Sequence, residues 1–143
     1  MKRFRSLSLI IIALIVLLSI TPALAYKKAS DFVKEAKKVI TEISPEEAYS
    51  YLNKKGYAFL DVREPSEYKK EHIPGAKNLP RGLLEFKIGR MFPEREAQII
   101  IVYCKSGGRG ALATKVLQEM GYKAINLKGG IAAWKKAGLP TEK

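Results

Sequence analysis

The residues best suited to chemistry form a short loop that begins at the only cysteine of the chain, Cys104. Five residues follow it, namely Lys105, Ser106, Gly107, Gly108 and Arg109. A loop rich in glycine can turn successive backbone N–H groups toward one point and so hold an anion. Converging N–H groups and neighbouring cations favour the thiolate of a cysteine, which is its nucleophilic form. The loop therefore predicts a reactive Cys104 that acts without a neighbouring histidine base.

Cys104 also allows a plainer interpretation, because a lone cysteine at the end of a buried strand is often a small apolar side chain that only packs. The basic, glycine-rich loop beside it favours the functional interpretation. One cysteine and one histidine cannot form an internal disulfide, and a single chain cannot build a zinc site from them. We therefore expect no metal and no disulfide framework.

The elements around the loop are expected to place it at one edge of a sheet. Ile99–Tyr103 is a continuous β-branched run, which is typical of a strand buried on both faces of a parallel sheet. Gly110–Met120 has the apolar spacing of a helix. Ligands of open α/β sheets bind at the carboxyl ends of strands, and a helix N-terminus adds the positive end of its dipole. Both features favour an anion at the loop.

Strand and helix patterns alternate along the rest of the chain. Further strands are predicted at Ala58–Val62 and Lys123–Leu127, and further helices at Ala29–Ile40, after the Ser44-Pro45-Glu46-Glu47 start signal, at Pro65–Lys70, at Gly82–Gly89 and after Gly129-Gly130. In the first helix, Phe32, Ala36, Val39 and Ile40 form the expected buried face. Val39–Ile43 is alternatively a first strand. The alternation predicts one α/β domain with a central parallel sheet between helices.

Residues 1–25 have the composition of a secretory signal peptide. A basic head precedes the apolar run Leu7–Ile20, and an Ala-x-Ala pattern ends at Ala25. The run is shorter than the roughly 20 residues that span a bilayer, which favours cleavage over a retained anchor. We expect an exported protein, periplasmic or extracellular, that contacts a membrane only if this segment is retained.

The formal charge of +12 invites the hypothesis of a nucleic-acid partner. The basic residues, however, are spread in pairs such as Lys37-Lys38 and Lys54-Lys55, which are interleaved with acids as on solvated helix faces. They are not clustered with stacking aromatics. The sequence therefore predicts no nucleic-acid partner, whereas a positive field that attracts small anions fits the charge.

Four motifs in order resemble those of single-domain rhodaneses, which are thiosulfate sulfurtransferase-like proteins. They are Asp61-Val62-Arg63-Glu64, Glu71-His72-Ile73-Pro74-Gly75-Ala76, the loop Cys104–Arg109, and Gly129-Gly130 with Trp134. The resemblance covers about Val39–Pro140 and implies a five-stranded, mostly parallel sheet flanked by helices on both faces. The expected organisation is a signal peptide at 1–25, a helical arm at 26–38 and a rhodanese-like domain at 39–143.

The resemblance implies sulfurtransferase chemistry, with a covalent persulfide on Cys104 and no separate cofactor. The loop cysteine would take the outer sulfur from a donor such as thiosulfate and pass it to a thiophilic acceptor. The N–H groups of residues 105–109 would cradle the sulfur, and Lys105 and Arg109 would neutralise the donor. Expected partners are a small anionic sulfur donor and a thiol, cyanide or protein acceptor. A sulfur-carrying or regulatory binding module with little turnover is the alternative.

Other residues and activities carry less weight. Asp61 and Arg63 either orient the loop, as the resemblance suggests, or form a strand-end cap and a structural ion pair. His72 is expected to be a turn residue that bonds to backbone, and Trp134 a core residue. Protein tyrosine phosphatases and arsenate reductases resemble this loop but have five residues between cysteine and arginine, whereas four separate Cys104 from Arg109. Such an activity is therefore disfavoured.

Overall fold

The computed structural model describes residues 26–143, so the predicted signal peptide at residues 1–25 lies outside the described residues. Five strands form one sheet in the order β1-β5-β4-β2-β3, and each neighbouring pair is parallel. The strands are β1 (Glu42–Ile43), β2 (Tyr57–Asp61), β3 (Lys77–Asn78), β4 (Ile99–Tyr103) and β5 (Lys123–Leu127). The predicted single α/β domain with a parallel sheet is confirmed.

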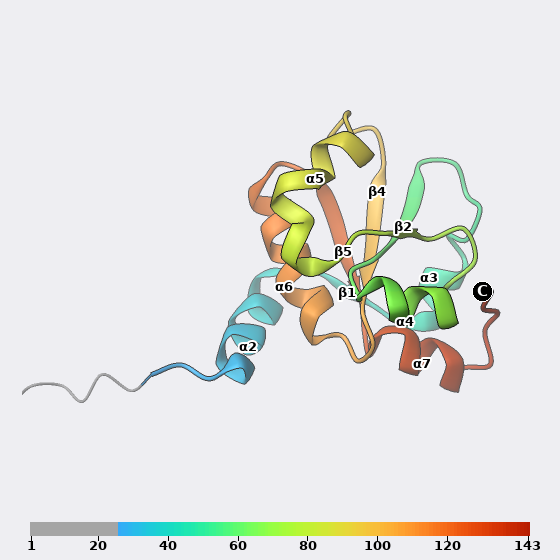
Figure 1. The fold of residues 1–143 in the computed structure, drawn as a ribbon, viewed down its shortest axis with the longest axis horizontal. Helices are drawn as coiled ribbons and strands as arrows, with labels where there is room; N and C mark the ends of the chain where they lie inside the picture. The colour runs from blue at the N-terminus through green and yellow to red at the C-terminus, as the bar shows by residue number, and fades with distance from the viewer. Residues whose placement is uncertain (1–25) are drawn as a thin grey trace, which may run out of the picture.

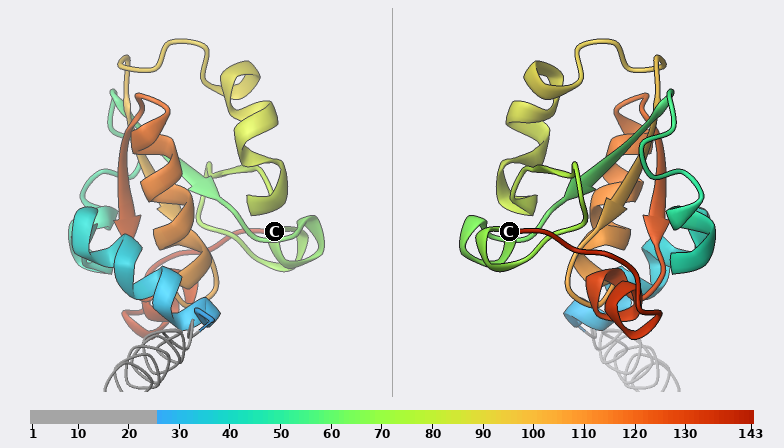
Figure 2. Two further views of the ribbon diagram at one scale, coloured as in Figure 1. Left: turned by 90° about the vertical axis from the view of Figure 1, so that its left-hand side faces the viewer. Right: turned by 90° about the vertical axis from the view of Figure 1, so that its right-hand side faces the viewer.

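Helices cover both faces of this sheet (Figure 1). They are α2 (Ala29–Val39), α3 (Pro45–Tyr49), α4 (Pro65–Lys70), α5 (Leu84–Met91), α6 (Gly108–Glu119) and α7 (Gly130–Lys136), with a 3-10 turn, η1, at Arg81–Leu83. Figure 2 shows the sheet between α3 on one side and α5 and α6 on the other. Since adjacent loops are short, the helices pack directly back onto the strands they connect.

The central strand β4 supplies side chains to the cores on both faces of the sheet. Ile100 and Val102 pack in the cluster beneath α5 and α6. Ile101 and Tyr103 pack in the other cluster, which includes the fully buried Trp134 of α7. This two-sided burial is what the continuous β-branched run predicted, and it anchors the strand that leads into the cysteine loop.

Helix α6 begins two residues earlier than the sequence indicated, at Gly108 rather than Gly110. Gly107 is the N-cap, in the left-handed conformation with φ of +97°. Glycine adopts this conformation without the steric cost that a side chain brings. The helix therefore takes up part of the expected loop, and its first N–H groups lie closer to Cys104 than predicted.

The N-terminal arm packs against the domain through α2, which lies beside α6 (Figure 1). Ala36 is buried, as predicted, but Phe32 and Val39 are 50% and 64% exposed, so their expected burial was wrong. The helix has α6 as its main neighbour, so only a narrow stripe of its surface is covered. β1 follows at Glu42–Ile43, so the segment Val39–Ile43, for which a helix and a first strand were alternatives, contains the end of α2 and the whole of β1. No helix within residues 26–143 is long and apolar enough to cross a bilayer.

Candidate active site

Cys104 directly follows the carboxyl end of β4, and α6 begins four residues later. Its side chain is 1% exposed and packs in the apolar cluster with Leu60 and Val102. The N–H of Gly107 donates a hydrogen bond to Sγ of Cys104 at 3.1 Å. The thiol is thus packed in the core and also contacted by a loop amide, which stabilises negative charge on sulfur.

The remaining N–H groups of the loop are free to bind an anion. Those of Lys105, Ser106, Gly108 and Arg109 have no hydrogen-bond acceptor within the described part of the chain. The last two belong to the first turn of α6, where N–H groups lack intrahelical partners and the helix dipole is positive. The side chains of Lys105 and Ser106 are exposed. The predicted cradle therefore has one amide at the sulfur and further donors beside it.

The Gly129-Gly130 motif holds the start of the loop from the side of α7. The N–H of Ile131 donates to the carbonyl of Cys104 at 2.9 Å, and that of Ala132 donates to Lys105 at 3.0 Å. A Cβ on Gly130 would collide with both carbonyl oxygens, and its φ is +60°. Only glycine allows this close approach of two backbones. The loop is consequently fixed by α7 as well as by β4 and α6.

Arg109, at the end of the loop, is bound by a carboxylate that the sequence analysis missed. Its Nη1 and Nη2 donate to Oε2 and Oε1 of Glu67 on α4, at 2.8 and 3.0 Å. These hydrogen bonds lower the pKa of Glu67 to about 2. The positive charge of Arg109, expected to meet the donor, is therefore already balanced by Glu67. The available signal for Glu67 was its place in a short helix after β2, the strand beside β4.

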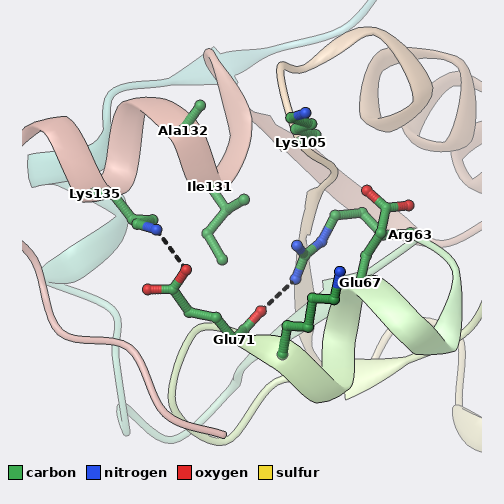
Figure 3. A pocket seen from close by; sticks show the side chains of 8 residues that line it. Arg63, Glu67, Glu71, Lys105, Ile131, Ala132 and Lys135 are labelled. Carbon is green, nitrogen blue, oxygen red and sulfur yellow. Dashed lines mark hydrogen bonds and ion pairs between the residues drawn. The ribbon is translucent and has the colours of Figure 1, made fainter.

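A pocket of about 320 Å³ opens beside the loop (Figure 3). Its lining residues are Arg63, Glu67, Lys70, Glu71, Lys105, Ile131, Ala132 and Lys135. Lys135 pairs with Glu71 at 2.5 Å, and this contact lowers the pKa of Glu71. Lys70 and Lys105 have no ion-pair partner within residues 26–143. Of the site residues predicted from sequence, Lys105 and Arg63 line this pocket.

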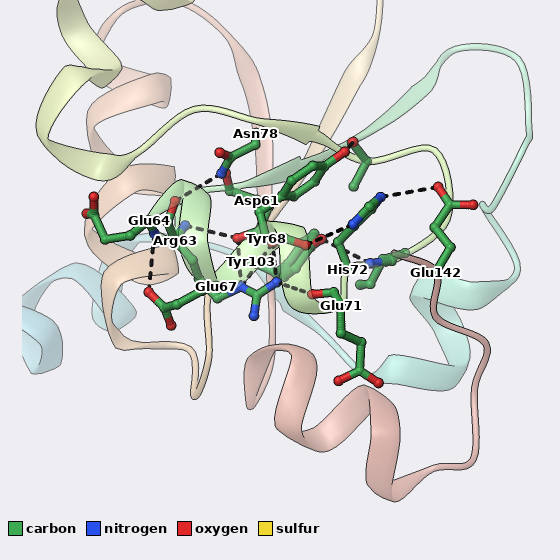
Figure 4. Close-up of polar contacts among 12 residues, drawn as sticks. Asp61, Arg63, Glu64, Glu67, Tyr68, Glu71, His72, Asn78, Tyr103 and Glu142 are labelled. Carbon is green, nitrogen blue, oxygen red and sulfur yellow. Dashed lines mark hydrogen bonds and ion pairs between the residues drawn. The ribbon is translucent and has the colours of Figure 1, made fainter.

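Asp61 and Arg63 form a buried ion pair (Figure 4). Arg63 Nη2 lies 2.6 Å from Oδ2 of Asp61, and Nε donates to both carboxylate oxygens at 2.9 Å. Nη2 also donates to the carbonyl of Glu71 at 2.7 Å. Burial and the nearby Asp61 raise the pKa of Tyr103. Neither side chain of the pair bonds to residues 104–109 in the part of the chain described, so a role in orienting the loop stays a prediction.

His72 bonds to backbone at a turn, as predicted. Its Nδ1 lies 3.0 Å from the carbonyl of Tyr68, and its backbone forms a two-residue bridge with Glu142 near the C-terminus. Glu142 also approaches Nε2 of His72 at 3.3 Å. No group of three or more His, Cys, Asp or Glu side chains among residues 26–143 is arranged to hold a metal ion.

The fold and the cysteine loop define the class of protein. Residues 44–137 match the model of the rhodanese-like domain, and the chain therefore belongs to this family. A solved structure of a rhodanese-related protein from Thermoplasma volcanium is 30% identical, with a TM-score of 0.65, and covers 71% of this chain and 97% of its own. The predicted family and fold are confirmed, and the chain contains a single such domain.

Individual relatives carry several names. An uncharacterised Synechocystis protein is 36% identical over 71% of this chain, which spans only 55% of that protein. A sulfurtransferase from Allochromatium vinosum is 37% identical over 57% of this chain and 74% of its own length. The putative sulfur carrier protein YrkF from Bacillus subtilis is 38% identical over 52% of this chain and 40% of its own length. These names support sulfur transfer in general.

The description of one similar solved structure names a different activity. It is a protein of unknown function from Rhodopseudomonas palustris, described as a possible tyrosine phosphatase. Its chain is 30% identical, the TM-score is 0.76, and the match covers 85% of this chain and 99% of that one. This match extends over more of the chain than the family model at residues 44–137.

Proposed function

We propose that this protein is an exported sulfurtransferase that moves a sulfane sulfur from an anionic donor to a thiophilic acceptor through a persulfide on Cys104. The observation that carries the proposal is the hydrogen bond from the Gly107 N–H to Sγ of Cys104 at 3.1 Å, at the N-terminus of α6. This contact stabilises both a sulfur nucleophile and a sulfur leaving group. Family membership and relatives named sulfurtransferases support the same chemistry.

The reaction consists of two displacements at sulfur. The Cys104 thiolate attacks the outer sulfur of thiosulfate, the S–S bond of the donor breaks, and sulfite leaves with the bonding electron pair. The persulfide then carries the transferred sulfur and one negative charge. An acceptor such as cyanide attacks that sulfur, the new S–S bond breaks, and thiocyanate and the thiolate result. Neither step needs an oxidant, a metal or a separate cofactor.

Residues of the loop have distinct roles in this proposal. The free N–H groups of Lys105, Ser106, Gly108 and Arg109 receive the outer sulfur once it is bonded to Cys104. Lys105, which is exposed at the pocket beside the loop, attracts the anionic donor. Arg109 also contributes positive charge, although its ion pair with Glu67 partly neutralises that charge. The pocket volume of about 320 Å³ leaves room for an acceptor larger than cyanide.

The test is thiocyanate formation from thiosulfate and cyanide by the full chain and by Cys104→Ser. We expect turnover by the native protein and a loss of at least 100-fold on substitution (about 2.7 kcal/mol). The serine variant should still fold, with an unfolding free energy lower by about 1–3 kcal/mol, because a hydroxyl replaces the thiol in an apolar cluster. Sulfite release without acceptor, with a mass gain of one sulfur, would identify the persulfide. Turnover that survives in the serine variant would contradict the proposal.

A second candidate is a sulfur-carrying module that loads Cys104 but transfers only to a specific protein. The name of the relative YrkF, a putative sulfur carrier, favours it. A stable mass gain of one sulfur on the native protein, without turnover to cyanide, would select this alternative. Hydrolysis of p-nitrophenyl phosphate without sulfur loading would instead select a phosphatase, the activity suggested for the R. palustris protein.

Export is proposed from the composition of residues 1–25. The basic head, apolar run and Ala-x-Ala pattern are those of a signal peptide. Expression of the full chain in a bacterial host, followed by fractionation and N-terminal sequencing, is expected to yield a periplasmic product that begins at Tyr26. A product that retains Met1 in the cytoplasm would contradict export.

A further inference from the structure

Asn126 of β5 lies beneath the cysteine loop and is completely buried. Its Nδ2 donates to Oε1 of Glu42 at 2.7 Å and to the carbonyl oxygen of Gly107 at 3.3 Å. The second contact joins β5 to the residue whose own N–H points at Sγ of Cys104. One side chain outside the loop thus contacts the residue that contacts the reactive sulfur.

The carbonyl oxygen of the Asn126 amide, Oδ1, lowers the stability of the fold. This atom is buried and has no hydrogen-bond partner among the described residues. An unpaired buried acceptor destabilises a fold, and an apolar side chain of the same shape avoids the penalty. The unpaired Oδ1 therefore offsets part of the stability that the two Nδ2 hydrogen bonds contribute.

The backbone beside the Asn126 amide has room for it because residue 110 is a glycine. Gly110, in the first turn of α6, lies so close that a Cβ there would collide with Oδ1 of Asn126. The absence of a side chain at Gly110 lets α6 approach β5 and brings the Gly107 carbonyl within reach of Nδ2. The side chain of Asn126 and the missing side chain of Gly110 therefore fit one another.

Gly107 is held at both of its peptide groups. Its N–H belongs to the peptide that faces Sγ, and its carbonyl belongs to the next peptide, which accepts from Asn126 and from the N–H of Ala111 at 2.9 Å. Glycine in the left-handed region is conformationally permissive, so its φ and ψ must be fixed by such contacts. Fixing the carbonyl also fixes the direction of the N–H toward sulfur.

The same amide connects the loop to the N-terminal arm. Glu42 of β1, which accepts from Asn126, is also paired with Lys37 of α2 at 3.1 Å. The backbone N–H of Asn126 donates to the carbonyl of Thr41 at 3.0 Å. The arm and the first strand thus orient Asn126, and this is a structural role for the arm.

We propose that Asn126 is a positioning residue that aligns the Gly107 N–H with Sγ of Cys104, an inference that rests on the proposed sulfurtransferase function. Through this alignment Asn126 affects how readily the sulfur reacts, without touching donor or acceptor. Loss of the hydrogen bond lowers the rate of sulfur loading about three- to ten-fold, the factor expected for one such bond.

Asn126→Leu and Asn126→Ala test the proposal, with Thr114→Val as the matched control. Thr114 is also fully buried, and its Oγ1 donates to the carbonyl of Gly110 at 2.9 Å, so the control removes a buried bond beside the loop without affecting Gly107. The measurements are sulfur loading from thiosulfate, Cys104 alkylation by iodoacetamide at fixed pH, and thermal unfolding.

We expect both Asn126 variants to fold with a lowered unfolding temperature, because the hydrogen bonds from Nδ2 to Glu42 and Gly107 are lost, and to load sulfur and be alkylated three- to ten-fold more slowly. Thr114→Val should retain native rates. Native rates in a folded Asn126 variant, equal losses in Thr114→Val, or loss of the fold in both Asn126 variants would each overturn the proposal. A native protein that loads no sulfur contradicts the proposed function, and alkylation then still tests Asn126.

Discussion

Arg109 of the cysteine loop is held by both carboxylate oxygens of Glu67, a residue of α4 that lies 42 positions earlier in the chain. The side chains of the pair are 37% and 30% exposed, so water weakens their attraction. Ion pairs with this exposure contribute only about 0–1 kcal/mol to folding. An anionic donor can therefore compete with Glu67 for the guanidinium at little cost.

The first prediction concerns Arg109→Ala. We expect kcat/KM for thiosulfate to fall about ten-fold, because a charged hydrogen-bond donor to the dianion is lost. Unfolding free energy should fall by less than about 1 kcal/mol, since the pair is partly exposed. Steady-state kinetics and urea denaturation measure the two effects. Arg81→Ala removes a similar pair with Glu85, away from the loop, and should leave the kinetics unchanged. A stability loss as large as the kinetic loss would make Arg109 structural.

The second prediction is a pH dependence that Glu67→Gln removes. Arg109 holds the pKa of Glu67 at about 2, below its usual value of 4.5. The pair therefore stabilises the fold fully above about pH 4.5, and this contribution is lost as pH falls toward 2. Urea denaturation between these pH values should show a steeper loss for the native protein than for Glu67→Gln, by up to about 1 kcal/mol. Parallel curves would show that the pair does not form in solution.

The third prediction compares two glycines that both have positive φ. Gly130→Ala should destabilise the fold clearly more than Gly138→Ala, because a Cβ on Gly130 meets the carbonyls of Cys104 and Lys105 while none lies near Gly138. Gly138→Ala should cost about 1–2 kcal/mol from backbone strain alone. Thermal and urea denaturation measure the difference. Equal losses would mean that the contact between α7 and the loop is unimportant.

The fourth prediction separates the two roles left open for Asp61 and Arg63. Asp61→Asn should cost about 3–5 kcal/mol, because it leaves the buried guanidinium without a counter-charge. Combining it with Arg63→Met should recover most of that loss, as measured by urea denaturation. If the double variant also transfers sulfur at the native rate, the pair is only structural. Restored stability with impaired transfer would instead assign the pair to positioning the loop.

The sequence by itself determined the family, the parallel sheet and the cysteine loop. These features can be recognised in short continuous stretches of sequence: the β-branched run of β4, the glycine-rich segment after Cys104, and Gly129-Gly130. Even here the helix α6 begins two residues before its predicted start, because the conformation of its N-cap Gly107 depends on contacts with Asn126 and Cys104.

Only the tertiary structure decided which side chains meet across elements. Glu67 reaches Arg109, and Asn126 reaches Gly107, because β4 lies between β2 and β5 in the sheet, an order that no single segment encodes. The exposure of Phe32 likewise depends on which neighbour α2 finds. Hydrogen bonds between segments distant in sequence form only once the strands are ordered, so the charge balance and alignment of the loop followed from the fold.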